Sequence, residues 1–396
     1  MIYNAGAVLS GFGAAGFDLS AVRFAALATN RQDGPYLYAF VRVALRCALV
    51  AGSSAGLIMT AYLLASGVLD LQLLAIAAAI TLFWALARVV AGLMRGAGML
   101  SSALLSDRVT RDVFLLALAG IASLTAWNLR AELMLFTLLA GTVIGFAFGS
   151  WLSARTVRRL CAQPAAILAR LDKAVHRDWI KVSVGLMAYN LAELLSSRFD
   201  IFVLSLLDSK EAVGALGLSL LLINLVTIPA AFLSLLIMPQ VAVAYEQRDK
   251  ARLWRLFKLT SIASGAMGIA LATVIIVMLP YARGMLPPAL SSELRWELLS
   301  GAIVFRSLCL IGSFPPILLM MSGHHKALIG AHLTGVAVRI GIYIACAAFI
   351  DPNLAIMAFV AGTMVVTALN LWQALKQLRG DEFTAGDKAA SQIHGI

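Results

Sequence analysis

The sequence predicts an all-α protein that crosses a membrane many times. Of its 396 residues, 61% are hydrophobic and only 13% are charged, whereas charged residues make up about 25% of an ordinary soluble domain. Runs of about 20 mostly apolar residues, the length that crosses the hydrocarbon core, follow one another along the chain. Backbone groups inside lipid find no water to bond, so these runs must fold as helices.

Apolar runs and their flanking residues predict about eleven spans. They lie near residues 4–28, 45–66, 71–94, 112–128, 132–154, 182–206, 213–238, 259–281, 297–321, 327–349 and 354–375. If the loops alternate between sides, 22 of the 31 Lys and Arg residues fall on one side and only four on the other. Positive residues favour the cytoplasmic side. We therefore expect a multi-pass protein of the bacterial inner membrane with a cytoplasmic C-terminus.

A charged turn recurs about half a chain apart. Asp33 lies in NRQDGPYLYAFVRVALR (30–46) and Asp249 in EQRDKARLWRLFK (246–258), 216 residues later. Such a repeat predicts two pseudo-symmetric lobes around a central cavity. The second lobe has six spans and the first only five, so we expect the first helix of a twelve-helix arrangement to be missing. The alternative is a protein with eleven helices of its own.

The spans and charges define four regions. Residues 1–154 form an N-terminal lobe of five spans, and 182–378 form a C-terminal lobe of six. Between them, 155–181 is a basic cytoplasmic connector, which we expect to be solvated and close to anionic headgroups. Residues 379–396 form a polar cytoplasmic tail.

The sequence carries no pattern typical of an enzyme. Cys47, Cys161, Cys309 and Cys346 are scattered and predict neither a metal site nor a disulfide framework. No nucleophile elbow, phosphate-binding glycine loop or zinc spacing is present. We therefore expect no catalysis, no cofactor and no metal. The net charge of +11 lies in the loops, which indicates a membrane surface rather than a nucleic-acid partner.

Five arginines lie within the predicted spans. Arginine at membrane depth costs several kcal/mol unless it faces a cavity or a partner. The functional interpretation is a cationic cavity that binds an anionic group, most plausibly phosphate. In the structural interpretation each arginine pairs with an acid inside the bundle or reaches to an interface. The five are Arg23, Arg88, Arg198, Arg306 and Arg339.

The acidic residues near each arginine in the sequence divide the five into two groups. Arg23 has Asp18 five residues earlier, and Arg198 has Glu193 and Asp200 close by. By contrast, no acid lies within a helical turn of Arg88, Arg306 or Arg339. Arg88 and Arg306 lie near mid-span and need an external partner most.

Acids inside spans are candidates for coupling transport to protons or sodium. Glu193 and Asp200 are the two acidic candidates, and Asn190, one turn before Glu193, is a neutral one. Prolines at 229, 239, 315 and 316 interrupt predicted helices, as either static kinks or hinges. His324 and His325 follow Gly323 in a short turn, and we interpret them as surface residues beside a glycine cap.

Three segments together resemble polysaccharide flippases of the multidrug/oligosaccharidyl-lipid/polysaccharide exporter superfamily. They are 16–33 (GFDLSAVRFAALATNRQD), 196–261, which runs from SSRFDIFVL to FKLTS, and 318–335 (LLMMSGHHKALIGAHLTG). In the middle segment the matching positions are Arg198, Asp200, Glu211, Ala212, Gly214 and Pro239. Each motif is diffuse, but their order extends over about residues 1–378.

The resemblance implies two lobes of helices around a cavity and transport of undecaprenyl-pyrophosphate-linked oligosaccharide for surface or exopolysaccharide synthesis. It places Arg23 and Arg198 on cavity-facing helices, where cationic residues are expected to contact the pyrophosphate. The expected partners are this lipid-linked substrate, membrane lipids and other polysaccharide-assembly proteins. Two alternatives stay open: a cation-coupled multidrug exporter of the same superfamily, in which cavity carboxylates should outnumber arginines, and a non-transporting scaffold.

Overall fold

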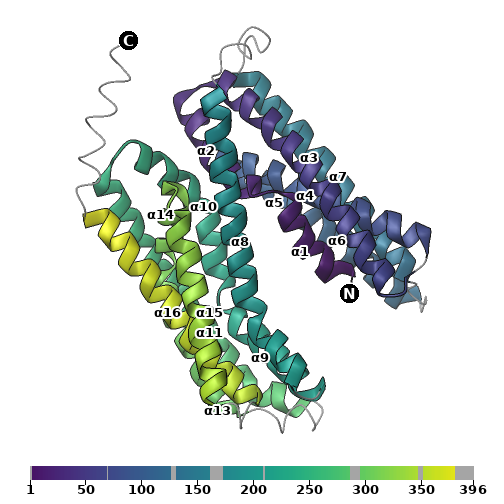
Figure 1. The fold of residues 1–396 in the computed structure, drawn as a ribbon, viewed down its shortest axis with the longest axis vertical. Coiled ribbons are helices and arrows are strands. Elements are labelled where there is room, and N and C mark those ends of the chain that lie inside the picture. Colours follow the sequence, from purple (N-terminus) through teal and green to yellow (C-terminus); the bar gives the residue numbers. More distant parts are fainter. Residues whose placement is uncertain are drawn as a thin grey trace. The chain divides into compact units, whose positions relative to one another are not determined.

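A computed structural model describes residues 2–68, 70–125, 131–160, 173–207, 210–285, 295–346 and 351–379 (Figure 1). In these ranges the secondary structure is entirely helical, which confirms the predicted fold class. The chain divides into two compact units, Met1–Asn190 and Leu191–Ile396. The division falls inside the helix that begins the predicted C-terminal lobe. The predicted tail, 379–396, lies almost wholly outside the described residues, as does 161–172 of the connector.

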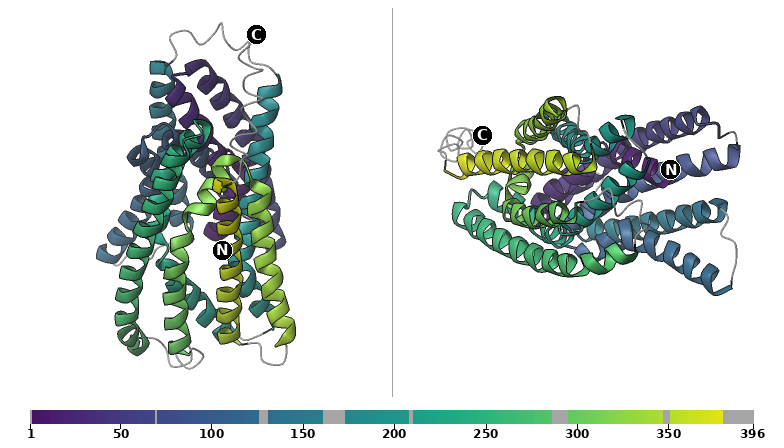
Figure 2. Two further views of the ribbon diagram at one scale, coloured as in Figure 1. Left: turned by 90° about the vertical axis from the view of Figure 1, so that its left-hand side faces the viewer. Right: turned by 90° about the horizontal axis from the view of Figure 1, so that it is seen from below.

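In the described ranges, the first unit has seven helices and the first half of an eighth. They are α1 (Ile2–Gly13), α2 (Phe17–Arg31), α3 (Gly34–Ala65), α4 (Leu71–Gly96), α5 (Leu100–Leu104), α6 (Thr110–Thr125), α7 (Ala131–Leu160) and α8 (Lys173–Leu207). A π-helical turn, Leu105–Val109, joins α5 to α6. Helices α3 and α4 run side by side in Figures 1 and 2.

Among the described residues, the second unit contains the rest of α8 and seven further helices. They are α9 (Lys210–Leu225), α10 (Ile228–Glu246), α11 (Lys250–Met285), α13 (Trp296–Cys309), α14 (Phe314–Ser322), α15 (His325–Ala345) and α16 (Pro352–Arg379), with a 3-10 turn, Leu310–Gly312, before α14. Its core gathers buried apolar residues from α8, α9, α13 and α16, among them Leu204, Leu216, Ile303 and Ile356.

Seven helices in the described ranges are long and apolar enough to cross a membrane. An eighth crossing results if α13 and α14, which meet at a bend of 41°, are taken together. Three of the eleven expected segments fall short of this test, and a fourth, 213–238, is divided between α9 and α10 at residues 226–227. The segment 4–28 is split into α1 and α2, α6 is a 16-residue helix, and α8 carries Glu193, Arg198 and Asp200 within its apolar run.

The split between α1 and α2 has a clear cause. Ala15 and Gly16 adopt positive φ angles of 50° and 73°, which end one helix and begin the next. A side chain at Gly16 would also collide with the backbone carbonyl of Ser183 in α8. Glycine is the residue that tolerates both conditions. The expectation of one unbroken helix over 4–28 was therefore wrong, although GFGAAG (11–16) signals flexibility.

The first half of α8 is held to the first unit by polar and aromatic contacts. Trp179, only 1% exposed, donates a hydrogen bond of 2.8 Å to the hydroxyl of Tyr36. Its indole also meets the ring of Phe40 edge-on, with centroids 5.3 Å apart. One turn further, the hydroxyls of Ser183 and Ser20 lie 2.7 Å apart. These contacts explain why the unit boundary lies beyond residue 182.

Prolines mark breaks at two of the expected places. Pro229 lies at the start of α10, just after α9 ends, and Pro315 and Pro316 lie in the first turn of α14. Proline fits a helix start because the first amides have no partner there. Pro239, in contrast, lies inside α10, which continues past it. Gly323 caps α14 with φ of 87° and His324 is exposed, as predicted, whereas His325 is half-buried and is not the surface residue expected.

The charged turns that suggested an internal repeat have matching geometry. In the first, Gln32 has φ of 54°, and in the second, Arg248 has φ of 55°. The amide of Asp33 donates to the carbonyl of residue 28 at 2.9 Å, and that of Asp249 to the carbonyl of residue 244 at 3.0 Å. Each is the long bond of a Schellman cap.

The two aspartates then cap the next helix in the same way. The Asp33 carboxylate accepts the amide of residue 36 at 3.0 Å, and the Asp249 carboxylate accepts that of residue 252 at 2.9 Å. Each side chain thus satisfies one of the unpaired amides at a helix start. Turns of one geometry, 216 residues apart, join α2 to α3 and α10 to α11.

We expect Asp33→Ala and Asp249→Ala each to lower the free energy of unfolding by about 1 kcal/mol, the usual worth of an N-cap. The two losses should be alike because the two caps are alike. Equilibrium unfolding of the purified protein in detergent measures them. Asp33→Asn and Asp249→Asn keep the accepting oxygen and serve as controls. Equal losses for Ala and Asn would show that capping is not what these side chains contribute.

Candidate functional site

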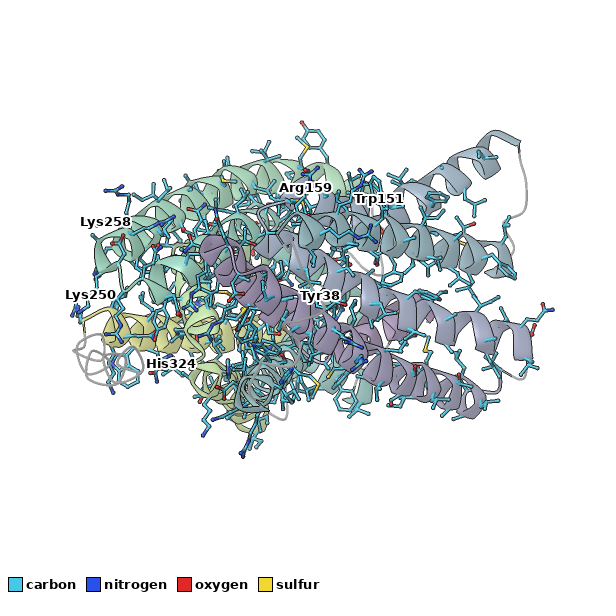
Figure 3. All side chains as sticks on the ribbon, turned by 90° about the horizontal axis from the view of Figure 1, so that it is seen from above. Tyr38, Trp151, Arg159, Lys250, Lys258 and His324 are labelled. Atoms are coloured by element: carbon cyan, nitrogen blue, oxygen red, sulfur yellow. The ribbon has the colours of Figure 1, made fainter. Side chains whose placement is uncertain are left out.

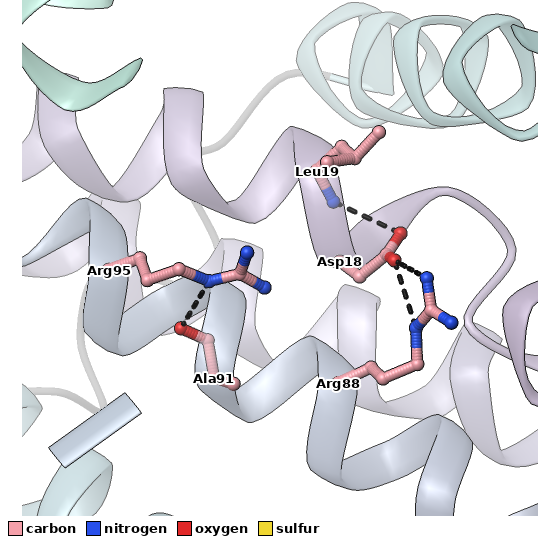
Figure 4. A network of polar contacts seen from close by, with 5 residues as sticks. All are labelled: Asp18, Leu19, Arg88, Ala91 and Arg95. Atoms are coloured by element: carbon pink, nitrogen blue, oxygen red, sulfur yellow. Dashed lines mark hydrogen bonds and ion pairs between the residues drawn. The ribbon is translucent and has the colours of Figure 1, made fainter. Parts of the chain in front are cut away.

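In the first unit, Arg88 of α4 forms an ion pair with Asp18 of α2 (Figure 4). Both Nη2 and Nε of Arg88 donate to Oδ2 of Asp18, at 2.7 and 3.1 Å. The other carboxylate oxygen accepts the amide of Leu19 at 3.1 Å. The Asp18 side chain is 4% exposed and that of Arg88 29% exposed. The pair is therefore buried at the acid and partly open at the guanidinium.

Glycines let the helices around this pair approach closely. A side chain at Gly92 would collide with the backbone carbonyl of Asp18, so α2 and α4 nearly touch there. A Cβ at Gly11 of α1 would lie 3.6 Å from Nη1 of Arg88. Two turns along α4 from Arg88, Arg95 donates from Nε to the carbonyl of Ala91 at 3.2 Å (Figure 4). The guanidinium of Arg88 therefore lies among α1, α2 and α4.

Asp18 is the partner that local sequence did not reveal for Arg88. The two residues are 70 positions apart, and Asp18 had been considered only as a neighbour of Arg23. Arg23 itself is half-buried, with its guanidinium carbon 5.7 Å from the ring centre of Phe24. The expectation that no protein acid serves Arg88 needs this correction, because helix packing supplies one.

A second buried ion pair lies in the second unit. Nη1 of Arg339 in α15 donates to Oδ2 of Asp200 in α8 at 2.7 Å and also to the backbone carbonyl of Ser196. Tyr343, one turn after Arg339, donates its hydroxyl to Oδ1 of Asp200 at 3.0 Å. The side chains of Arg339 and Asp200 are 2% and 0% exposed. Such a pair is sealed from both water and ligand.

The guanidinium of Arg339 is also enclosed by α16. Its carbon lies 4.9 Å from the ring centre of Phe359, a cation–π contact. A side chain at Gly362 would collide with Arg339 itself, and Gly335 and Gly362 face one another where α15 meets α16. Glycine at these places makes the room that the arginine fills.

Arg198 does not pair with Asp200, contrary to one sequence interpretation. Residues two apart on a helix point in different directions, and Arg198 and Glu193 are both exposed on α8 while Asp200 is fully buried. Tyr343 is a functional neighbour that the sequence analysis missed. Its spacing of four residues from Arg339 places both on one face of α15 and was the available signal.

Arg306 of α13 differs from Arg88 and Arg339. It is half-buried, its Nε is buried without a hydrogen-bond partner among the described residues, and it makes no ion pair within 4.0 Å there. The charges of Glu193 and Arg339 lie within electrostatic range. Asn190, half-buried on α8, likewise has a buried Nδ2 with no partner among the described residues. Arg306 thus keeps hydrogen-bonding capacity at membrane depth.

The described residues include no group of three or more His, Cys, Asp or Glu side chains placed to hold a metal ion. Cys47, Cys309 and Cys346 are free thiols, and Cys161 lies outside the described residues.

Comparison with known proteins identifies the fold. No family model and no curated protein sequence matches the chain. A solved MATE structure in the bent conformation is 15% identical, with a TM-score of 0.73, and the match covers 98% of this chain and 89% of that one. An outward-facing multidrug resistance MATE family transporter of the MOP superfamily is 14% identical, with a TM-score of 0.78 and coverage of 95% and 87%.

The Vibrio cholerae MATE transporter VcmN in the bent form is similar in the same way, at 15% identity, a TM-score of 0.69, and coverage of 94% and 86%. The class is therefore that of polytopic membrane proteins with a two-lobed transporter fold. More particularly, the chain has the fold of MATE transporters of the MOP superfamily. This is the two-lobed helical fold that the sequence predicts.

We expect Asp200→Asn or Arg339→Gln to lower the free energy of unfolding by about 3–5 kcal/mol, since each leaves a buried charge without its partner. The double variant should lose less than the sum of the two single losses, because it removes both charges. Unfolding of the purified protein in detergent provides the measurement. Arg88→Gln is the comparison, and its partly exposed side chain predicts a smaller loss. Additive losses for Asp200 and Arg339 would contradict a direct pairing.

Proposed function

We propose that this chain is an alternating-access transporter that carries undecaprenyl-pyrophosphate-linked oligosaccharide across the bacterial inner membrane. The cargo belongs to the synthesis of surface or exopolysaccharide. The fold supports transport, and the excess of arginine over acid in the helices supports an anionic cargo. The bias of Lys and Arg between loops supports a cytoplasmic C-terminus.

The observation that carries the proposal is that Arg306 lacks an acidic partner among the described residues. Asp18 and Asp200 each neutralise one arginine, Arg88 and Arg339. Arg306 has no such ion pair in the described part of the chain, and one of its nitrogens is buried without a hydrogen bond. A guanidinium presents several N–H groups in a planar fork that matches two oxygens of a phosphate. It is suited to receive a pyrophosphate where water is scarce.

The physical task of such a protein is to lower the cost of moving a charged headgroup through the bilayer. A charge buried without a partner costs many kcal/mol. Fixed guanidinium groups replace part of the water that the diphosphate loses, while the lipid tail stays in the membrane. Rocking of the two lobes would then expose the headgroup to the other side. No bond is made or broken.

The remaining predicted residues take graded roles in this proposal. Arg306 binds the diphosphate directly. In the first unit, Arg88 has a partly open guanidinium, and Arg23 and Arg198 add positive charge along α2 and α8. Arg339 is a positioning residue because it is sealed by Asp200 and Phe359. Glu193, whose charge acts on Arg306, and Asn190, one turn before Glu193 on α8, are the candidates for ion coupling.

A second candidate function has its own support. Two of the solved structures named above are a multidrug resistance transporter and VcmN, both MATE proteins, so similarity of fold favours a cation-coupled drug exporter. That activity needs accessible carboxylates, and Asp18 and Asp200 are occupied by arginines. Glu193, exposed on α8, is the acid to test. A non-transporting scaffold would move neither cargo.

We expect Arg306→Gln to slow translocation of lipid-linked oligosaccharide by about ten- to a hundredfold, the worth of one charge-assisted hydrogen bond. Proteoliposomes in which a lectin or glycosidase reports the leaflet of the sugar measure the rate. Arg306→Lys keeps the charge but not the fork and should be intermediate. The control is Arg283→Gln, because Arg283 is an exposed arginine in the last turn of α11.

Two outcomes would contradict the flippase assignment. One is a normal rate for Arg306→Gln at normal abundance. The other is efflux of a cationic dye that depends on a proton or sodium gradient, is lost in Glu193→Gln and is indifferent to Arg306→Gln. If correctly folded protein shows neither lipid-linked oligosaccharide translocation nor dye efflux, the non-transporting scaffold is favoured.

A further inference from the structure

The exposed face of α7 changes character toward its end. Ile144, Phe148 and Trp151 are apolar or aromatic and exposed, and Arg155, Arg158 and Arg159 follow them, also exposed. At 100° per residue these positions fall on one side of the helix. Figure 3 labels two of them, Trp151 and Arg159. We call this set the α7 outer face.

The side of α7 that packs within the first unit lies about a quarter turn around the helix from the outer face. Gly141, Gly145 and Gly149 repeat at four-residue intervals, and a Cβ at any of them would crowd the segment 105–111 or α4. The Cβ of Gly141, for example, would lie 3.0 Å from the Cα of Arg111. The side chains of the outer face are exposed and lie beside this packed stripe rather than within it.

An aromatic and a cation are already stacked on this face. The guanidinium carbon of Arg155 lies 3.8 Å from the ring centre of Trp151, and the Trp151 ring lies 6.3 Å from that of Phe148. Stacking orders the guanidinium and leaves its edge open for hydrogen bonds. Among the described residues, Arg155, Arg158 and Arg159 make no ion pair.

We propose that the α7 outer face is a binding site for the phosphate of an anionic glycerophospholipid. Aromatic side chains favour the headgroup level of a bilayer, with apolar residues below them and cations above. The three arginines match the charge of an anionic headgroup, and each basic residue near such a surface contributes about fivefold in binding. Phe148 and Ile144 lie where the acyl chains begin. This proposal uses none of the residues assigned to the proposed cargo and does not depend on that cargo.

The test is native mass spectrometry of the full chain in mixed micelles that contain equal amounts of phosphatidylglycerol and phosphatidylcholine. We expect bound phosphatidylglycerol to exceed phosphatidylcholine, and Arg155→Gln/Arg158→Gln/Arg159→Gln to reduce that preference at least tenfold. Trp151→Leu should reduce it about threefold by releasing Arg155. All these side chains are exposed, so the variants should stay folded, as unfolding in detergent will report.

The matched control is Arg283→Gln, because Arg283 is also exposed and lies 5.9 Å from the ring centre of a tryptophan, Trp296. It should leave the lipid preference unchanged, whereas Arg155→Gln alone should lower it. An unchanged preference in the triple variant overturns the proposal, and so does an equal effect of Arg283→Gln. A dimer that dissociates in Trp151→Leu would assign the face to a second copy of the chain, which also overturns it.

Discussion

The cost of a charge at membrane depth is the constraint on which this structure depends. Arginine cannot give up its proton in such surroundings, so a partner must be built around it. Two of the buried arginines meet this need with an aspartate from a distant helix, at 2.7 Å in both cases. Each ion pair thereby ties together helices that are far apart in sequence: α2 to α4 in the first unit and α8 to α15 in the second.

Glycine makes both ion pairs sterically feasible. Gly92 lets α2 approach α4 beside Asp18, while Gly335 and Gly362 let α15 approach α16 around Arg339. Without an aqueous hydrophobic effect, close packing and interhelical polar contacts are what hold membrane helices together. Glycine therefore has two roles here. Its lack of a Cβ permits close helix contact, and it leaves the volume that a guanidinium occupies. Arg306 is a half-buried cation for which the described chain supplies no such arrangement.

Sequence reasoning predicted the helical class and the internal repeat because both are local properties. Runs of apolar residues reveal a helix in lipid, and Asp33 and Asp249 are visible as repeated letters. It could not predict that Arg88 pairs with Asp18, since a 70-residue separation carries no periodic signal. It misjudged the segment 4–28 because a break caused by the positive φ of Ala15 and Gly16 leaves hydropathy unchanged. It also considered Arg198 as a partner of Asp200, where helix geometry rules out the contact.

The paired turns at residues 28–37 and 244–253 have a consequence for how the chain tolerates change. Their backbones follow the same course although only the aspartate, one leucine and one alanine recur between the two segments. The shape is therefore encoded by a left-handed residue followed by a capping acid, and the remaining side chains are free to diverge. The two segments are interchangeable parts, and a chimaera that swaps them would keep the connection between its helices while exchanging the surface charge each lobe presents.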